Sequence, residues 1–326
     1  MTRAAGANAL VIAFVSGAVL VAGQGAGSGL REEQVIISSD DGRVLAGTLT
    51  LPAGSPPFPV ALSLTGSGAH LRAGNRTPDH SYRPFRHIAN ALAARGIAML
   101  RVDDRGIGGS TGDGNAATGD DVANDARAAV RWLRARAGID GARVALIGHS
   151  FGGEVAPMVA ASDPAIAAVV LMGAPARNFR ETMKYQNRYL VDTDTTIPVA
   201  KKAAALERMT AQQERNVASS LEKWRQWSQD RDPLPTARLL RCPVLILQGK
   251  TDRAVPPSDA TLLENAIREG GNHRVTVRFF EKVNHHFQRD PVGARSGYDR
   301  LPTQDLAPEF LDTLGEWLRR ILIVSR

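Results

Sequence analysis

The stretch that decides the fold is Arg143-Val144-Ala145-Leu146-Ile147-Gly148-His149-Ser150-Phe151-Gly152-Gly153. Its first five residues are mostly apolar and predict a buried parallel strand, and the run from Glu154 onward is compatible with a helix. Between them, Gly148 and Gly152 allow a turn too tight for residues that carry a Cβ. Such a turn lifts the Ser150 hydroxyl out of the sheet and sets it near a helix N-terminus. The sequence therefore predicts a strand, a tight turn that presents a serine, and a helix.

The pattern Gly-x-Ser-x-Gly is weak evidence alone, because Gly and Ser are common residues. A serine hydroxyl is also a poor nucleophile unless a histidine base lies within reach and a carboxylate orients that histidine. Asp252 and His285 follow Ser150 in the order serine, acid, histidine, and each comes after a predicted strand. Because the carboxyl ends of parallel strands share one edge of a sheet, these three side chains are expected to meet there.

Length and composition narrow the classes of protein. A chain of 326 residues fits one large domain, or one domain with an inserted subdomain. The net charge of +7 arises from 40 basic and 33 acidic residues, but the arginines are scattered among acids, so no nucleic-acid partner is expected. Cys242 is the only cysteine and is predicted to be a small buried residue. Asp192 and Asp194 have no His or Cys beside them, so no metal is expected there.

Residues 1–27 differ from the rest of the chain. Arg3 precedes an apolar run from about Ala9 to Ala22, and small residues follow this run. This pattern is typical of a cleaved secretory signal peptide, so the mature protein is expected to be secreted or periplasmic. The apolar run is short for a bilayer span, which makes an uncleaved anchor the lesser alternative, and no stable membrane anchor is expected.

Strand and helix patterns alternate along most of the chain. The segments 34–39 and 44–51 predict a hairpin, and from Val60 onward short apolar strands alternate with amphipathic helices. This alternation is typical of an α/β fold with a mostly parallel central sheet and helices on both faces. A terminal helix is predicted over 304–323.

The alternation breaks between residues 177 and 238, where only helical spacing remains. An insertion at this point lies over the carboxyl edge of the sheet, where α/β sheets bind ligands, and it is interpreted as a helical cap. A helical lobe packed to one side is the alternative. Trp224 and Trp227 are expected in the core of the insertion. The predicted organisation is a signal peptide (1–27), a first core segment (28–176), the cap (177–238) and a second core segment (239–326).

From about Gln34 to its end, the chain resembles the α/β-hydrolases. It is most similar to capped bacterial carboxylesterases and serine-aminopeptidase-like hydrolases. The motifs that match are Thr65-Gly66-Ser67-Gly68, Asp104-Arg105-Gly106-Ile107-Gly108-Gly109-Ser110, Gly148-His149-Ser150-Phe151-Gly152, Gly249-Lys250-Thr251-Asp252 and Asn284-His285-His286-Phe287. The resemblance implies an α/β-hydrolase fold and hydrolysis through an acyl-enzyme, a reaction that requires no metal or organic cofactor.

The oxyanion formed during acyl transfer needs two preorganised N–H donors. Phe151 is expected to supply one, and Ser67 in the loop after Leu64 the other. The family's loop often begins His-Gly, whereas this chain has Thr65-Gly66. Because the donors are backbone amides, this departure is not expected to abolish the oxyanion hole. A plain turn over 65–68 is the alternative.

The sequence also supports expectations for four further features near the predicted site. In the family the base commonly occurs as Asn-His-x-Phe, which favours His285 over His286. His70 and His286 are candidate substrate contacts, and an exposed surface position is the alternative for His70. His149 is expected to point away from the chemistry. The cluster Asp103, Asp104 and Arg105 is expected to brace its loop through internal ion pairs, as such residues usually do in the family, and a functional cluster is the alternative.

The function expected from these residues is that of a serine esterase of the carboxylesterase type, acting on a small-molecule ester. A serine peptidase or a thioesterase would use the same chemistry. A peptidase that recognises a free amine would need an acidic residue in the cap, and Glu181, Glu207 and Glu214 are candidates. A binding protein that has lost catalysis is the third alternative, although such loss normally removes a catalytic residue and none is missing here.

Overall fold

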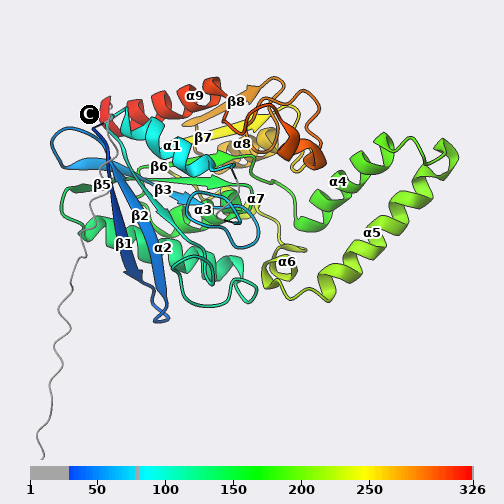
Figure 1. Ribbon diagram of the computed structural model, residues 1–326, viewed down its shortest axis with the longest axis horizontal. Helices are drawn as coiled ribbons and strands as arrows, with labels where there is room; N and C mark the ends of the chain where they lie inside the picture. The colour runs from blue at the N-terminus through cyan, green and yellow to red at the C-terminus, as the bar shows by residue number, and fades with distance from the viewer. Residues whose placement is uncertain (1–28, 78–80, 325–326) are drawn as a thin grey trace, which may run out of the picture.

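The computed structural model describes residues 29–77 and 81–324, so the predicted signal peptide lies outside the described residues. Its centre is an eight-stranded sheet in the order β1-β2-β4-β3-β5-β6-β7-β8 (Figure 1). β2 is antiparallel to both β1 and β4, and all other neighbouring strands run parallel, which confirms the predicted sheet. The strands are β1 (Arg31–Ser38), β2 (Val44–Leu51), β3 (Phe58–Leu64), β4 (Ala98–Val102), β5 (Ile139–His149), β6 (Ala168–Met172), β7 (Val244–Gly249) and β8 (Val275–Phe280).

Helices cover both faces of the sheet, as predicted. In β5, Val144 and Leu146 face one apolar cluster, while Ala145 and Ile147 face the other, so the strand is buried on both sides. The helices α2 (Gly119–Ala135), α3 (Gly152–Ser162) and α8 (Asp259–Glu269) pack on the first face, and α1 (Pro84–Ala93) and α9 (Pro308–Arg319) pack on the second.

The terminal helix begins later than the sequence predicts. α9 starts at Pro308 rather than at residue 304, and it continues as a short π-helical turn over Arg320–Val324. Proline is favoured in the first turn of a helix, where its missing N–H leaves no hydrogen bond unmade. In the described ranges, no helix is both long and apolar enough to cross a bilayer.

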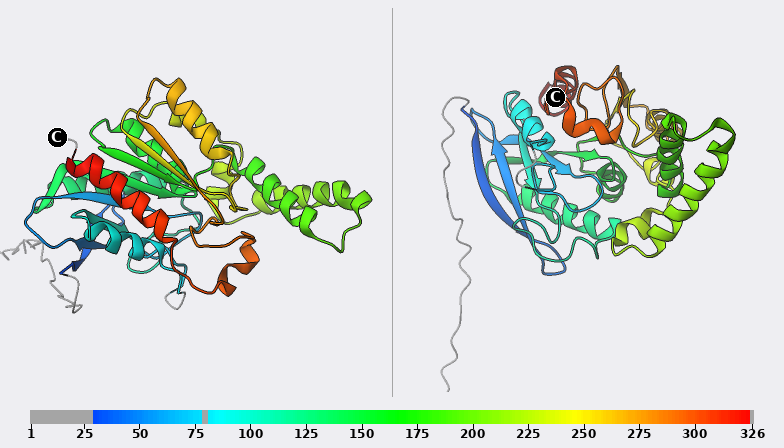
Figure 2. Two further views of the ribbon diagram at one scale, coloured as in Figure 1. Left: turned by 90° about the horizontal axis from the view of Figure 1, so that it is seen from above. Right: turned by 45° about the vertical axis from the view of Figure 1, so that its right-hand side comes forward.

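The segment between β6 and β7 is helical, as the sequence predicts. Figures 1 and 2 show α4 and α5 side by side, projecting from the core. The hydroxyl of Tyr185 in α4 donates to the Asp252 carbonyl (2.8 Å), and Trp224 in α6 packs on Phe151. The insertion therefore touches the edge of the sheet that carries the predicted site, which is consistent with a cap. Its helices are α4 (Phe179–Thr193), η1 (Val199–Lys201), α5 (Lys202–Ala218), α6 (Lys223–Ser228) and α7 (Leu234–Ala237).

The turn from β5 into α3 is as tight as its glycines suggest. A Cβ at Gly148 would overlap the Gly152 carbonyl, and a Cβ at Gly152 would overlap the Leu64 carbonyl. Ser150 itself adopts a φ of 53°, a left-handed conformation that non-glycine residues rarely occupy outside functional sites. Its amide donates to the Met172 carbonyl of β6 (2.9 Å), which fixes the turn at the carboxyl edge of the sheet.

Candidate active site

Ser150, Asp252 and His285 follow the ends of three different strands, β5, β7 and β8. The Nδ1 atom of His285 lies 2.8 Å from Oδ2 of Asp252. Both side chains are buried, so this hydrogen bond is protected from solvent. The structure thus pairs an acid and a histidine that lie 33 residues apart in the sequence, at the edge where Ser150 is presented.

The Asp252 carboxylate is surrounded by N–H donors. Its Oδ1 accepts from the amides of Ala254 and Val255, both at 2.8 Å, and its Oδ2 also accepts from Nε2 of Gln248 at 3.0 Å. A carboxylate held by donors alone acts as an acceptor, so Nδ1 of His285 carries the proton of this hydrogen bond. Nε2 of a neutral His285 is then left with a lone pair and can act as a base.

Ser150 and His285 both lie against the end of β6. No hydrogen bond joins Ser150 Oγ to His285 within the described part of the chain. The two residues share their surroundings: Ser150 bonds to the Met172 carbonyl, and a Cβ on the next residue, Gly173, would lie 3.1 Å from His285 Nδ1. A bond between nucleophile and base is often long in a free enzyme and tightens when substrate binds.

Phe151 directly follows Ser150, and the loop that contains Ser67 also passes close to the nucleophile. A Cβ at Gly66 would be 3.6 Å from Ser150 Cβ, so the loop after β3 passes directly against the nucleophile. Among the described residues, the amides of Gly66, Ser67 and Phe151 have no hydrogen-bond acceptor. The Ser67 carbonyl accepts from Nη2 of Arg76 (2.8 Å), which orients the following peptide. These free amides are what an oxyanion hole requires.

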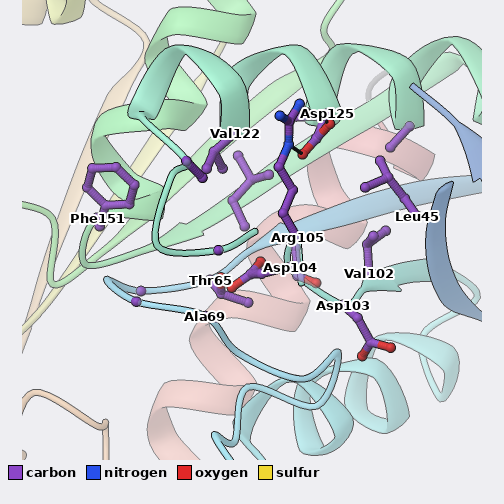
Figure 3. Close-up of a pocket in the computed structure, with 18 of the residues that line it drawn as sticks. Leu45, Thr65, Ala69, Val102, Asp103, Asp104, Arg105, Val122, Asp125 and Phe151 are labelled. Atoms are coloured by element: carbon purple, nitrogen blue, oxygen red, sulfur yellow. Dashed lines mark hydrogen bonds and ion pairs between the residues drawn. The ribbon is translucent and has the colours of Figure 1, made fainter. Parts of the chain in front are cut away.

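Asp104 holds the loop that carries these amides. Its Oδ2 accepts from the Thr65 hydroxyl (2.7 Å) and from the His70 amide (2.8 Å), so one carboxylate ties both ends of the loop together. Thr65 and Asp104 lie beside each other in Figure 3. The His70 ring adds a bond from Nδ1 to the Gly68 carbonyl (2.9 Å). His70 is therefore part of the loop's internal bonding rather than a free surface residue, and its role as a substrate contact stays a prediction.

The neighbours of Asp104 brace the same region, as expected. Asp103 accepts from Nε of Arg72 (3.0 Å), and Arg105 is buried with its Nη2 atom 2.8 Å from Asp125 Oδ1. These pairs hold the loop after β4 against its surroundings.

His149 contradicts the expectation that it points away from the site. Its Nε2 lies 3.0 Å from the His285 carbonyl, and the two ring centroids are 4.8 Å apart. Burial, together with the neighbouring His285, lowers the pKa of His149 to about 3. His149 is therefore neutral, and its Nε2–H donates to the backbone of the candidate base.

The ring of His286 lies beside that base, with its centroid 6.1 Å from the His285 ring. Its ring stacks on Tyr82, with centroids 4.4 Å apart, and the Tyr82 hydroxyl donates to the His286 carbonyl (2.8 Å). Burial and the neighbouring His285 hold the pKa of His286 well below its usual value. His285 is thus the histidine that pairs with Asp252, as the motif favoured. A substrate contact by His286 stays a prediction.

Outside the site, Cys242 is less buried than the sequence predicts. Cys242 is a free, half-buried thiol whose pKa burial raises to about 11, so it is poorly reactive. Across residues 29–77 and 81–324, no group of three or more His, Cys, Asp or Glu side chains is arranged to hold a metal ion.

Comparison with known proteins identifies the family of this chain. Residues 75–292 match the family described as Serine aminopeptidase, S33. The chain belongs to this family. Among its relatives, esterase EstD of Thermotoga maritima is 29% identical over 277 residues, which cover 84% of this chain and 65% of EstD. YuxL of Bacillus subtilis, named as an uncharacterized peptidase, is 26% identical over 265 residues, covering 79% of this chain and 36% of YuxL. The chain thus spans only part of the length of these relatives.

Solved structures show the same fold as this member of the S33 family. An esterase from Pyrococcus furiosus superposes with a TM-score of 0.62 at 19% identity, over 89% of this chain and 91% of its own. An esterase domain from Rhodothermus marinus gives a TM-score of 0.55 at 22% identity, over 89% of this chain and 99% of its own. The predicted α/β-hydrolase fold is confirmed.

Two residues of the candidate site, Gln248 and His149, were missed as contributors to it, and Asp104 was predicted only as part of a bracing cluster. Gln248 lies in β7, four residues before Asp252, and this short separation along the chain is the one signal that placed it nearby. The sequence shows which residues stand next to His149 and Asp104 along the chain, but it does not show which groups of other loops they contact.

Proposed function

We propose that the chain is a serine carboxylesterase that works through an acyl-enzyme. The observation that carries the proposal is the buried Asp252–His285 hydrogen bond at the edge where the strained turn presents Ser150. The name of EstD and the esterases among the structural relatives support ester bonds as the substrate.

In the first half of the reaction, Ser150 Oγ attacks the ester carbonyl carbon while His285 Nε2 accepts the hydroxyl proton. Asp252 holds the imidazole in the required tautomer and stabilises its charged form. The carbonyl oxygen becomes an oxyanion, which accepts hydrogen bonds from the amides of Phe151 and Ser67, with Gly66 beside them. Collapse of this intermediate breaks the carbon–oxygen bond, and His285 returns the proton to the leaving alcohol.

In the second half, water repeats the sequence on the acyl-enzyme. His285 removes a proton from water as the water oxygen attacks the acyl carbon, and the same amides stabilise the second oxyanion. The proton then passes to Ser150 Oγ, the acid is released, and the free serine is restored. These steps use only groups of the chain and water.

Short p-nitrophenyl esters test this function. Wild-type protein is expected to hydrolyse them, and Ser150→Ala is expected to lose about 10⁴-fold or more in kcat. Ser162→Ala, at the far end of α3, is the matched control. It should retain wild-type activity because, among the described residues, the Ser162 hydroxyl bonds only to its own helix and to Arg127. A Ser150→Ala protein with wild-type kcat would overturn the assignment.

An aminopeptidase is the second candidate, and one cleft favours it. A cleft of about 1010 Å³ lies between α4, α5 and the loop after Asp252. Of the three candidate acids, Glu214 pairs with Arg180, whereas Glu181 and Glu207 line the cleft and form no ion pair with described residues. Either could receive a substrate ammonium group, in competition with the basic side chains that line the same cleft: Arg177, Lys184, Arg188 and Arg253. Alanyl p-nitroanilide tests this candidate. Hydrolysis that exceeds ester hydrolysis and is lost on N-acetylation of the substrate would favour the peptidase.

We propose further that the protein is exported and loses its first residues. The basic start, short apolar run and small residues at the N-terminus support this localisation. N-terminal sequencing of the protein recovered from the periplasm or medium tests it. An intact Met1 on an intracellular protein would contradict it.

A further inference from the structure

A separate cavity begins beside the oxyanion loop and extends between the sheet and α2 (Figure 3). It has a volume of about 70 Å³. Gly66 and Phe151 line it at the nucleophile's end, and Leu45 and Val102 line it at the opposite end in Figure 3. The other apolar residues that line it are Leu62, Leu64, Ala69, Ala117, Val122, Ala126, Ala129 and Trp224.

The polar groups in the wall are already engaged. Arg105 pairs with Asp125 and with Asp41 (3.0 Å), and Asp104 is occupied by Thr65 and His70. A ligand entering the cavity therefore meets apolar side chains and no free charge. Such a wall favours an aliphatic group and disfavours a charged or strongly polar one.

The order of the strands decides which half of an ester would enter. Ser150 follows β5 in the middle of the sheet, and His285 and Asp252 follow β8 and β7 on one side of it. The cavity lies on the other side, against β3, β4 and β2. The leaving alcohol must lie near His285, which protonates it, so the acyl chain is the half that can extend away from His285.

We propose that this cavity binds the acyl chain, and that the enzyme prefers esters of short aliphatic acids. This proposal rests on the esterase function proposed above. The space is enough for roughly five water-sized groups, since one such group needs about 10–15 Å³ of this volume. The acyl chain that fills it therefore has about four to six carbons.

Two series of esters test the proposal. With p-nitrophenyl esters of increasing acyl length, kcat/KM is expected to rise roughly fourfold per methylene up to about six carbons and then fall. With acetate esters of increasing alcohol length, no such optimum is expected. An optimum in the alcohol series alone would show that the cavity holds the alcohol instead, and would overturn the proposal.

Substitutions in α2 test whether this cavity sets the preferred acyl length. Ala126 is buried and lines the cavity, so Ala126→Leu is expected to keep acetate hydrolysis within about twofold but to lower kcat/KM for the hexanoate ester at least tenfold. Ala135→Leu makes the same change at an exposed position of the same helix and should behave as wild type. Val122→Ala enlarges the cavity and should move the optimum of kcat/KM to longer acyl chains. This variant tests the assignment of the cavity even if Ala126→Leu does not fold.

The outcomes separate the two proposals. A wild-type protein that hydrolyses no ester overturns the esterase function and this assignment with it. An active esterase whose acyl-length profile is unchanged by both Ala126→Leu and Val122→Ala, or is shifted equally by Ala135→Leu, overturns only the acyl cavity.

Discussion

Nδ1 of His285 lies 2.8 Å from Oδ2 of Asp252, and the same carboxylate accepts three further N–H groups, from Gln248, Ala254 and Val255. Four donors on one buried carboxylate leave it little freedom to rotate. The orientation of the imidazole is therefore set before substrate arrives, which supports a role for His285 as a base.

Asp252→Asn is expected to lower kcat about 10³- to 10⁴-fold with little change in KM. The amide would favour the wrong imidazole tautomer while keeping the shape of the side chain, an effect known from serine proteases. Steady-state kinetics on a p-nitrophenyl ester measure it, and circular dichroism checks that the fold is retained. A loss of less than tenfold in a folded variant would mean that Asp252 does not orient the base.

Thr65→Val is expected to lower kcat about 10- to 100-fold while KM stays within about twofold. The substitution removes the hydroxyl that ties the oxyanion loop to Asp104, and a displaced donor weakens the transition state more than the bound substrate. Thr65→Ser keeps the hydroxyl and should restore most of the activity. If Thr65→Ser is as impaired as Thr65→Val, the hydrogen bond is not the cause.

His149→Phe is expected to lower kcat by about three- to tenfold, because one hydrogen bond to the His285 backbone is lost. The pH profile separates this structural role from a catalytic one. The pKa of His149 is about 3, so it stays neutral across pH 5–8 and contributes no ionisation there. The apparent pKa of kcat/KM should therefore be the same in wild type and variant, and a shifted or missing acid limb would contradict this.

Glu154→Gln is expected to stabilise the protein at high pH. Burial raises the pKa of Glu154 in α3 to about 8, while the nearby Arg231 lowers it. Between the unfolded-state pKa of 4.5 and the folded-state pKa of about 8, the unfolded chain releases a proton that the folded protein keeps. Stability therefore falls as pH rises across this range, and the loss is complete once pH passes about 8. At pH 9 the variant should exceed wild type by a few kcal/mol in free energy of unfolding, since each pKa unit is worth about 1.4 kcal/mol.

Urea unfolding at pH 5 and pH 9 measures this difference. Wild type should lose stability between the two pH values by more than Glu154→Gln does. Equal pH dependence in the two proteins would show that Glu154 ionises in the folded state as it does in the unfolded one.

The sequence predicted those parts of the molecule that depend on hydrophobic periodicity or on the order of motifs along the chain. The strands, the helical insertion and the succession of Ser150, Asp252 and His285 each follow from local pattern. The contacts of His149 and Asp104 depend on how separate loops meet, and no local pattern encodes them. The cavity beside α2 is likewise invisible in the sequence, because its small residues Ala126 and Ala129 have the same spacing as an ordinary helix core.

The most direct test of the account is covalent labelling with a fluorophosphonate probe. Mass spectrometry of the labelled wild-type protein should place the adduct on Ser150 at near one equivalent, and His285→Ala should slow labelling by several orders of magnitude. An adduct on another serine, or labelling of Ser150→Ala at the wild-type rate, would contradict the claim that this serine, aided by His285, is the nucleophile.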